Sequence, residues 1–281
     1  MKVQRIRTIV FTAFAGLVAV ASWLLLEGLT EGLLPWVQLG CPGCPENAVA
    51  YPIELLRWHG AEHGAMLGVL FAGALVGLLW RARERPLLLQ FYVLGHLTLI
   101  AGFLPFRPAS TPPGQMIAFA IEVIVTLALM CALYPAPRKL FSFSGAAFSP
   151  RLGAAALASA AIMGTVALQH LHWQLAGFGG ASASESRWAE SVILSVCLIL
   201  ASVLTATRRP GWQALGVITS LAYVYLGIAA IAVPDQPGSW GMLGGIASIA
   251  GGLAYAAVIF AEARPGAPVA TRNTRAATAQ I

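Results

Sequence analysis

Eight apolar stretches dominate this 281-residue chain, and each is long enough to cross a lipid bilayer. A hydrocarbon core of about 30 Å requires roughly 20 helical residues. The stretches cover approximately residues 8–26, 55–80, 87–104, 115–133, 152–175, 188–205, 212–233 and 240–260. Because lipid offers no hydrogen-bond partners to an exposed backbone, such spans form helices. The sequence therefore predicts an all-α integral membrane protein, a polytopic bundle of eight transmembrane helices.

The composition excludes a water-soluble domain. Only 10% of the residues are charged and 58% are hydrophobic, whereas soluble domains carry roughly 25% charged residues. The formal charge of +6 comes from short basic clusters between the apolar stretches. A nucleic-acid partner is not predicted, because binding nucleic acid requires a continuous basic surface.

The basic residues predict the orientation of the bundle. If the first span enters from the cytoplasm, 14 of the 17 Lys and Arg residues lie inside, and only Arg57, Arg107 and Arg187 lie outside. The positive-inside rule then places both termini in the cytoplasm. We expect a multi-pass protein of the plasma (inner) membrane. The first stretch could also be a signal peptide with a cleavage site at 19–21, but its apolar run continues to residue 26 and favours retention.

The predicted domain organisation is simple. Residues 1–263 form a single eight-helix transmembrane domain with an outer loop at 28–52, and residues 264–281 form a disordered cytoplasmic tail because they are small and polar. A duplication of four plus four spans is an alternative. The Cys41-Pro42-Gly43-Cys44 motif of the outer loop has no counterpart after the fifth span, so we interpret the chain as one bundle.

Ionisable residues inside the spans mark the candidate site, because burying them in lipid is costly and they are usually functional. Most of them gather in the outer half of the predicted bundle, on five helices. These are Glu27, His59, Glu62, His63, Glu122, His170, His172 and Glu190, while His96 lies near the middle of the third span.

The sharpest motif lies at the start of the second span. His59 and His63 are one helical turn apart, so they share a face with Glu62. Gly60 and Gly64 would leave space for a flat macrocycle or a neighbouring helix. Imidazole ligates haem iron, Cu, Zn and Fe, so this motif predicts haem or a transition metal. The alternative is a pair of interfacial histidines that bind backbone or lipid headgroups.

The fifth span is expected to supply another ligand. His170 and His172 lie about 200° apart on a helix, so only one of them joins the site, and we favour His170. The cofactor would then lie between the second and fifth spans. Glu27, Glu62, Glu122, His96 and Glu190 would support the ligands or relay protons.

His96 and Glu122 lie on adjacent antiparallel spans, where a paired role or a proton path is expected. A neutral glutamic acid bound to a backbone carbonyl is the alternative. Cys41 and Cys44 are expected to form a disulfide in an oxidising compartment, or else a redox-active or metal-capturing dithiol. Cys131 and Cys197 stand alone in their spans and are interpreted as packing residues.

Two families resemble parts of this pattern. Eight spans, an outer cysteine pair, and a Glu and His near the outer end of the second span resemble haem A synthase, which implies haem binding. That family also has haem ligands on its fourth, sixth and eighth spans, where this chain has no histidine. Trp58-His59, followed by Glu62-His63 and a glycine, is similar to the Trp-His-x-His-Glu stretch of NnrS-type haem and copper proteins, over a short stretch only.

The leading hypothesis is a membrane protein that binds haem or a transition metal (Cu, Zn or Fe) in its outer leaflet, for electron transfer or cofactor handling. One alternative is a proton- or ion-coupled transporter that uses a Glu122/His96 relay. Another is a non-catalytic accessory subunit of a larger membrane complex. The expected partners are the lipid bilayer, other membrane subunits, or a redox partner at the outer face.

Overall fold

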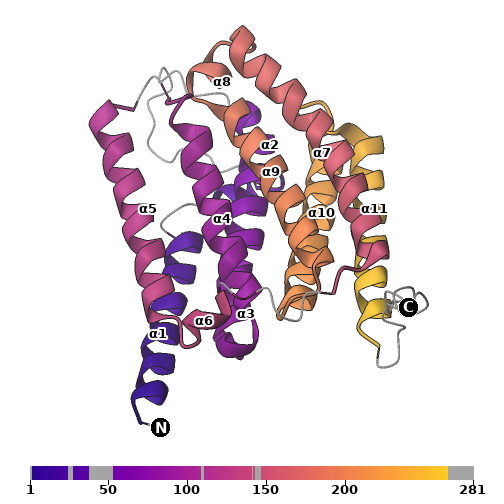
Figure 1. Ribbon diagram of the computed structural model, residues 1–281. Helices are drawn as coiled ribbons and strands as arrows, with labels where there is room; N and C mark the ends of the chain where they lie inside the picture. The colour runs from indigo at the N-terminus through magenta and orange to yellow at the C-terminus, as the bar shows by residue number, and fades with distance from the viewer. Residues whose placement is uncertain are drawn as a thin grey trace, which may run out of the picture.

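A computed structural model describes residues 2–24, 28–37, 53–108, 111–140, 142 and 147–264. Every regular element in this part of the chain is helical (Figure 1). Glu27, the predicted Cys41–Cys44 disulfide, and all of the predicted tail except residue 264 lie outside the described residues.

Eight of the described helices are long and apolar enough to cross a membrane, as predicted. They are α1 (Lys2–Leu24), a second span composed of α2 (Ile53–His63), the π-helix η2 (Gly64–Phe71) and α3 (Ala72–Leu79), then α4 (Pro86–Phe103), α5 (Pro113–Leu133), α7 (Pro150–Ala176), α9 (Arg187–Ala206), α10 (Trp212–Ala232) and α11 (Gly241–Glu262). The short elements are η1 (Glu31–Leu33), η3 (Ala82–Glu84), α6 (Pro137–Leu140) and α8 (Ala181–Ser184).

The helix ends follow the local sequence. Helices α4, α5 and α7 each begin with proline, whose missing N–H costs nothing in the first turn. Ser149 caps α7, because its Oγ accepts a hydrogen bond from the Leu152 amide at 3.3 Å. Gly177 ends the same helix with a left-handed φ of 68°. These signals explain why the predicted and observed span boundaries differ by only a few residues.

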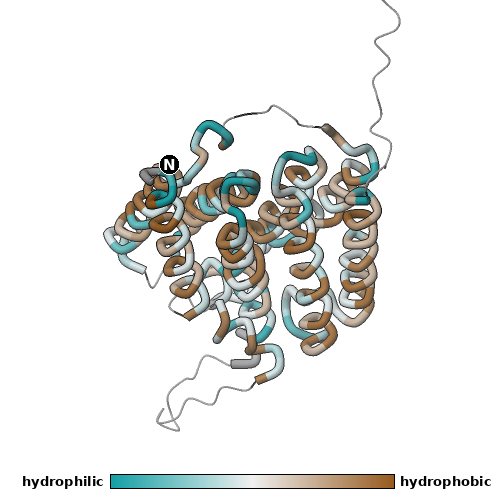
Figure 2. Tube along the Cα trace, turned by 90° about the horizontal axis from the view of Figure 1, so that it is seen from below, coloured by the Kyte–Doolittle hydropathy of each residue, from teal (hydrophilic) through white to brown (hydrophobic). Residues whose placement is uncertain are grey.

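The eight spans divide into a central and a peripheral set. In the second, third, sixth and seventh spans, 50 to 67% of the residues in the most apolar 18-residue stretch are buried. In the first, fourth, fifth and eighth spans the buried share of that stretch is only 11 to 22%. Seen from below, apolar residues cover the outward faces of the helices and polar residues gather at the loops (Figure 2). This distribution is expected for a bundle whose outer surface faces lipid.

The two halves of the chain pack in the same pattern. Helix α1 packs on the second span as α7 packs on α9, and α5 packs on α4 as α11 packs on α10. Across the halves, α4 contacts α9 and α10 contacts the second span. The order of contacts is therefore the same in the two four-span halves, which neither establishes nor excludes the duplication considered from the sequence. One buried apolar cluster nevertheless draws residues from all eight spans.

Candidate metal site at one end of the bundle

His59 and His63 lie side by side on α2, at the end of the bundle opposite the N-terminus. Their ring centroids are 4.5 Å apart. This geometry confirms the prediction that the i,i+4 spacing places both imidazoles on one face of the helix. Both side chains are mostly buried, with exposed fractions of 12% for His59 and 19% for His63.

Glycines bring a third residue, Glu31, to this pair. A Cβ atom on Gly64 would lie 2.6 Å from the Cα atom of Gly32, and a Cβ on Gly60 would lie 2.8 Å from Leu34 Cδ1. Only glycine therefore lets η1 approach α2 this closely. In the structure the space beside these glycines is taken by η1.

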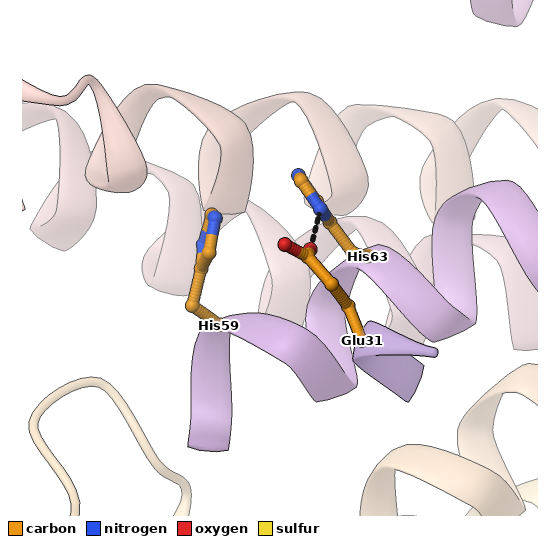
Figure 3. Close-up of side chains that lie close together, drawn as sticks. All are labelled: Glu31, His59 and His63. Carbon is orange, nitrogen blue, oxygen red and sulfur yellow. Dashed lines mark hydrogen bonds and ion pairs between the residues drawn. The ribbon is translucent and has the colours of Figure 1, made fainter. Parts of the chain in front are cut away.

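Within η1, the Glu31 carboxylate extends to the histidine pair. Its Oε2 atom contacts Nδ1 of His63 (Figure 3). The Tyr225 hydroxyl holds the segment from α10 by donating to the Gly32 carbonyl at 2.6 Å. Glu31 was not predicted, because it lies in a loop without periodicity. The available signal was the pair Glu31-Gly32 together with two glycines on the facing helix.

The sixth span contributes a second carboxylate. Glu190 Oε2 is 2.7 Å from His59 Nε2 and 2.8 Å from His63 Nε2. Glu190 lies in the first turn of α9, where the helix dipole favours a negative charge. Glu31, His59, His63 and Glu190 together are called the carboxylate–histidine cluster below.

Carboxylate oxygens lie against three of the four ring nitrogens of His59 and His63. Both ring nitrogens of His63 face carboxylate oxygens, and each such contact requires a proton or a metal ion between the two atoms. His59 Nδ1 is buried without a hydrogen-bond partner among the described residues. The arrangement could therefore hold protons between these atoms or a cation.

The spacing of the ligand atoms suits one metal ion. Glu31, His59 and His63 each offer a ligand atom within 4.8 Å of the other two. Ligand atoms bound at 2.0–2.2 Å to one ion are at most about 4.4 Å apart, so small side-chain rotations close the site. A donor set of two imidazoles and a carboxylate is typical of Zn²⁺ and Fe²⁺, whereas Cu⁺ prefers sulfur ligands.

Glu62 connects α2 to α9 beside the cluster. It is 4% exposed, and the Ser191 hydroxyl donates to its Oε2 atom at 2.6 Å. The same hydroxyl lies 3.2 Å from the Arg187 carbonyl in the preceding turn of α9. This hydrogen bond links α2, which carries His59 and His63, to α9, which carries Glu190.

A small cavity lies against His59 and Glu62. Its walls come from α2, α8, α9 and the segment before α11, and comprise Trp58, His59, Glu62, Ser182, Arg187, Trp188 and Pro237. It has room for about one water molecule. This cavity is much smaller than a haem group.

The fifth span does not contribute to the cluster. His170 is 2% exposed and therefore faces inward, as expected, but its ring lies against Trp173 and Trp188 with centroids 5.1 and 5.5 Å away. His172 is exposed. The predicted site between the second and fifth spans is corrected to one formed by the second and sixth spans with η1, because Trp188 separates His170 from the cavity beside His59.

His96 and Glu122 do not form the predicted pair. The Nδ1 atom of His96 lies 2.9 Å from the Tyr92 carbonyl, and its ring packs between Tyr92 and Phe71 with centroids 4.1 and 4.2 Å away. Glu122 lies on an exposed face of α5. Because His96 is enclosed by aromatic rings, a relay between the two residues is not present. Cys131 and Cys197 are free thiols, and Cys197 is fully buried.

Comparison of the chain with family models, with curated proteins and with solved structures finds no match.

Proposed function

We propose that this chain is a multi-pass membrane protein that binds one transition-metal ion through Glu31, His59 and His63. The observation that carries the proposal is the mutual distance of at most 4.8 Å between their ligand atoms. Glu190 Oε2 contacts Nε2 of both histidines, whereas Glu31 contacts Nδ1 of His63, so Glu190 would orient the two rings by accepting from their Nε2–H groups and would not join Glu31 on the ion. The donor set favours Zn²⁺ or Fe²⁺.

The position of the cluster supports metal handling at the outer face. The predicted orientation places this end of the bundle outside the cytoplasm, and the cavity beside His59 and Glu62 offers an approach from that end. In the absence of the ion, the carboxylates and imidazoles hold each other through short contacts. Binding then exchanges protons for the metal, which makes it pH-dependent. With iron bound, the site would be able to transfer one electron.

The test is the metal content of purified protein. We expect close to one equivalent of Zn or Fe per chain, measured by elemental analysis of protein from its native membrane. His63→Ala should weaken metal binding at least about tenfold and lower the content, because loss of one ligand costs at least about 1.4 kcal/mol of binding free energy. His59→Ala and Glu31→Gln should also reduce it.

His172→Ala is the matched control, because His172 is an exposed histidine that does not belong to the cluster. It should retain the ion fully. Full occupancy in a variant that lacks both His59 and His63 would contradict the proposal, and an intense Soret absorption band would favour haem instead.

A proton-coupled transporter is the second candidate, and one observation favours it. Glu31, His63, Glu190 and His59 form an unbroken chain of contacts along which protons could pass. A metal-free preparation that moves protons in liposomes, and stops doing so in Glu190→Gln, would support this candidate over metal binding. The relay would then use the cluster and not Glu122 and His96.

A further inference from the structure

Helix α5 is the least buried of the eight spans. Only 11% of the residues in its most apolar 18-residue stretch are buried, against 17% or more in each of the others. It stands at the edge of the bundle, where it packs on α1 and α4 (Figure 1). Most of its surface is therefore available to lipid or to another protein in the membrane.

An acidic residue lies on this open surface. Glu122 is exposed, and it forms no hydrogen bond or ion pair within the part of the chain that the structure describes. It lies about 14 Å along the axis from the first residue of α5 and about 16 Å from the last, so its short side chain does not reach water at either membrane surface. A carboxylate at this depth is costly without a partner, and a cation at the same depth removes that cost.

The residues around Glu122 have the spacing of a helix-packing seam. Six exposed positions of α5 follow one another at alternating intervals of four and three residues, which is the repeat of a pair of packed helices. Four of the six are Gly or Ala, which allow helix backbones to approach closely in a membrane. Glu122 flanks the middle of the seam, at a position that forms interhelical salt bridges in coiled coils. The six residues, called the α5 seam below, are Gly114, Ala118, Ile121, Val125, Ala128 and Ala132.

The charge of Glu122 identifies the kind of helix that fits this seam. None of the 17 Lys and Arg residues of the chain lies in the middle of a span, and His96, near the middle of α4, is buried in the core. A second copy of the chain therefore brings no cation to this depth. Copies inserted with the same topology also lie parallel, so two α5 helices would place their Glu122 carboxylates side by side. The complementary helix therefore belongs to a different protein.

We propose that the α5 seam docks a transmembrane helix of a partner subunit, and that this helix carries a Lys or Arg at the depth of Glu122. The small residues of the seam allow the two backbones to approach, and the ion pair fixes the depth at which the partner helix lies. The docking surface is independent of the carboxylate–histidine cluster, to which α5 contributes no residue.

Fluorescence energy transfer in phosphatidylcholine liposomes tests the proposal with the full-length protein and two synthetic peptides. One peptide is a transmembrane helix rich in Leu and Ala with a central Arg, and the other has Leu in place of that Arg. We expect the Arg peptide to bind about tenfold more tightly, because its contact with Glu122 satisfies two polar groups inside the bilayer. Glu122→Gln should reduce its binding to the level of the Leu peptide, since Gln keeps the size of the side chain and removes the charge.

Ala118→Leu tests the packing of the seam. A leucine side chain at this position holds the two backbones apart, so the Arg peptide should bind more weakly. Ala161→Leu is the matched control, because Ala161 is also an exposed alanine on a peripheral span, α7, and does not belong to the seam. It should bind the Arg peptide as the parent protein does.

Three outcomes would overturn the proposal. Equal binding of the Arg and Leu peptides would indicate that α5 faces lipid and that Glu122 lies there as a neutral acid. Unchanged binding of the Arg peptide by Glu122→Gln would show that the charge contributes nothing. Energy transfer between donor- and acceptor-labelled copies of the chain in the absence of peptide, lost in Ala118→Leu, would show that a second copy occupies the seam.

Discussion

Gly64 is the residue on which the position of Glu31 depends. Alanine at this position would place its Cβ atom 2.6 Å from Gly32 Cα and against the Tyr225 hydroxyl. Backbone atoms of η1 cannot yield cheaply, so we expect η1 to move away from α2 and Glu31 to leave His63. Gly64→Ala should cost about 1–3 kcal/mol of stability and lower the metal content.

Thermal unfolding and elemental analysis of the same preparations check this prediction. Gly164→Ala serves as the control, since its Cβ atom meets nothing within 4 Å and alanine favours a helix by up to about 1 kcal/mol. If Gly64→Ala kept both its stability and its metal, the close approach of η1 would not be what positions Glu31.

Single residues show how far the sequence predicts the site. The spacing of His59 and His63 predicts a shared face, because helical geometry is local. The contact of Glu190 with both histidines depends on how α9 packs against α2, which spacing along one helix does not specify. The inward orientation of His170 is predicted, whereas its packing against the rings of Trp173 and Trp188 is not.

At the scale of elements, the apolar helix α5 carries a glutamate, Glu122, near its middle. Glu122 lies nine residues after the first residue of α5, about 14 Å along the axis, on an exposed face. A charged side chain at the centre of a spanning helix disfavours insertion by about 2.5–3.5 kcal/mol. We expect Glu122→Leu to make the insertion of α5 more favourable by about 3 kcal/mol.

A glycosylation-based insertion assay of the α5 segment measures this change. Gln115→Leu is the control near the helix end, where polar residues are tolerated, and should give a much smaller gain. An equal gain in the two variants would contradict a central position of Glu122 in the hydrocarbon.

Regular elements are predicted well because length and hydrophobicity specify them. The eight spans follow from apolar runs bounded by prolines such as Pro86 and Pro150. The π-helix η2 and the short helix η1 are not predicted, because both occur where two segments approach through Gly32 and Gly64. Such contacts depend on tertiary packing, which periodicity does not encode.

At the scale of the whole molecule, the cluster forms where the two halves of the chain meet. The second span supplies His59 and His63, and the sixth span supplies Glu190. An Arg-Trp pair lies near the cluster end of each of these spans, Arg57-Trp58 in one and Arg187-Trp188 in the other. Because each half contributes residues to the cluster, neither half forms it alone.

The orientation of the bundle decides which compartment the cluster faces, and it rests on the 14 to 3 division of basic residues between the two ends. Ser184 lies in α8 at the cluster end, and Ser142 lies before α7 at the opposite end. In a background lacking Cys41, Cys44, Cys131 and Cys197, each serine is replaced singly by cysteine. We expect a membrane-impermeant maleimide to label Ser184→Cys in intact cells, and Ser142→Cys only after the membrane is permeabilised. Labelling of Ser142→Cys in intact cells would reverse the topology and place the cluster at the cytoplasmic face, where the cell's cytosolic metal pool would supply it.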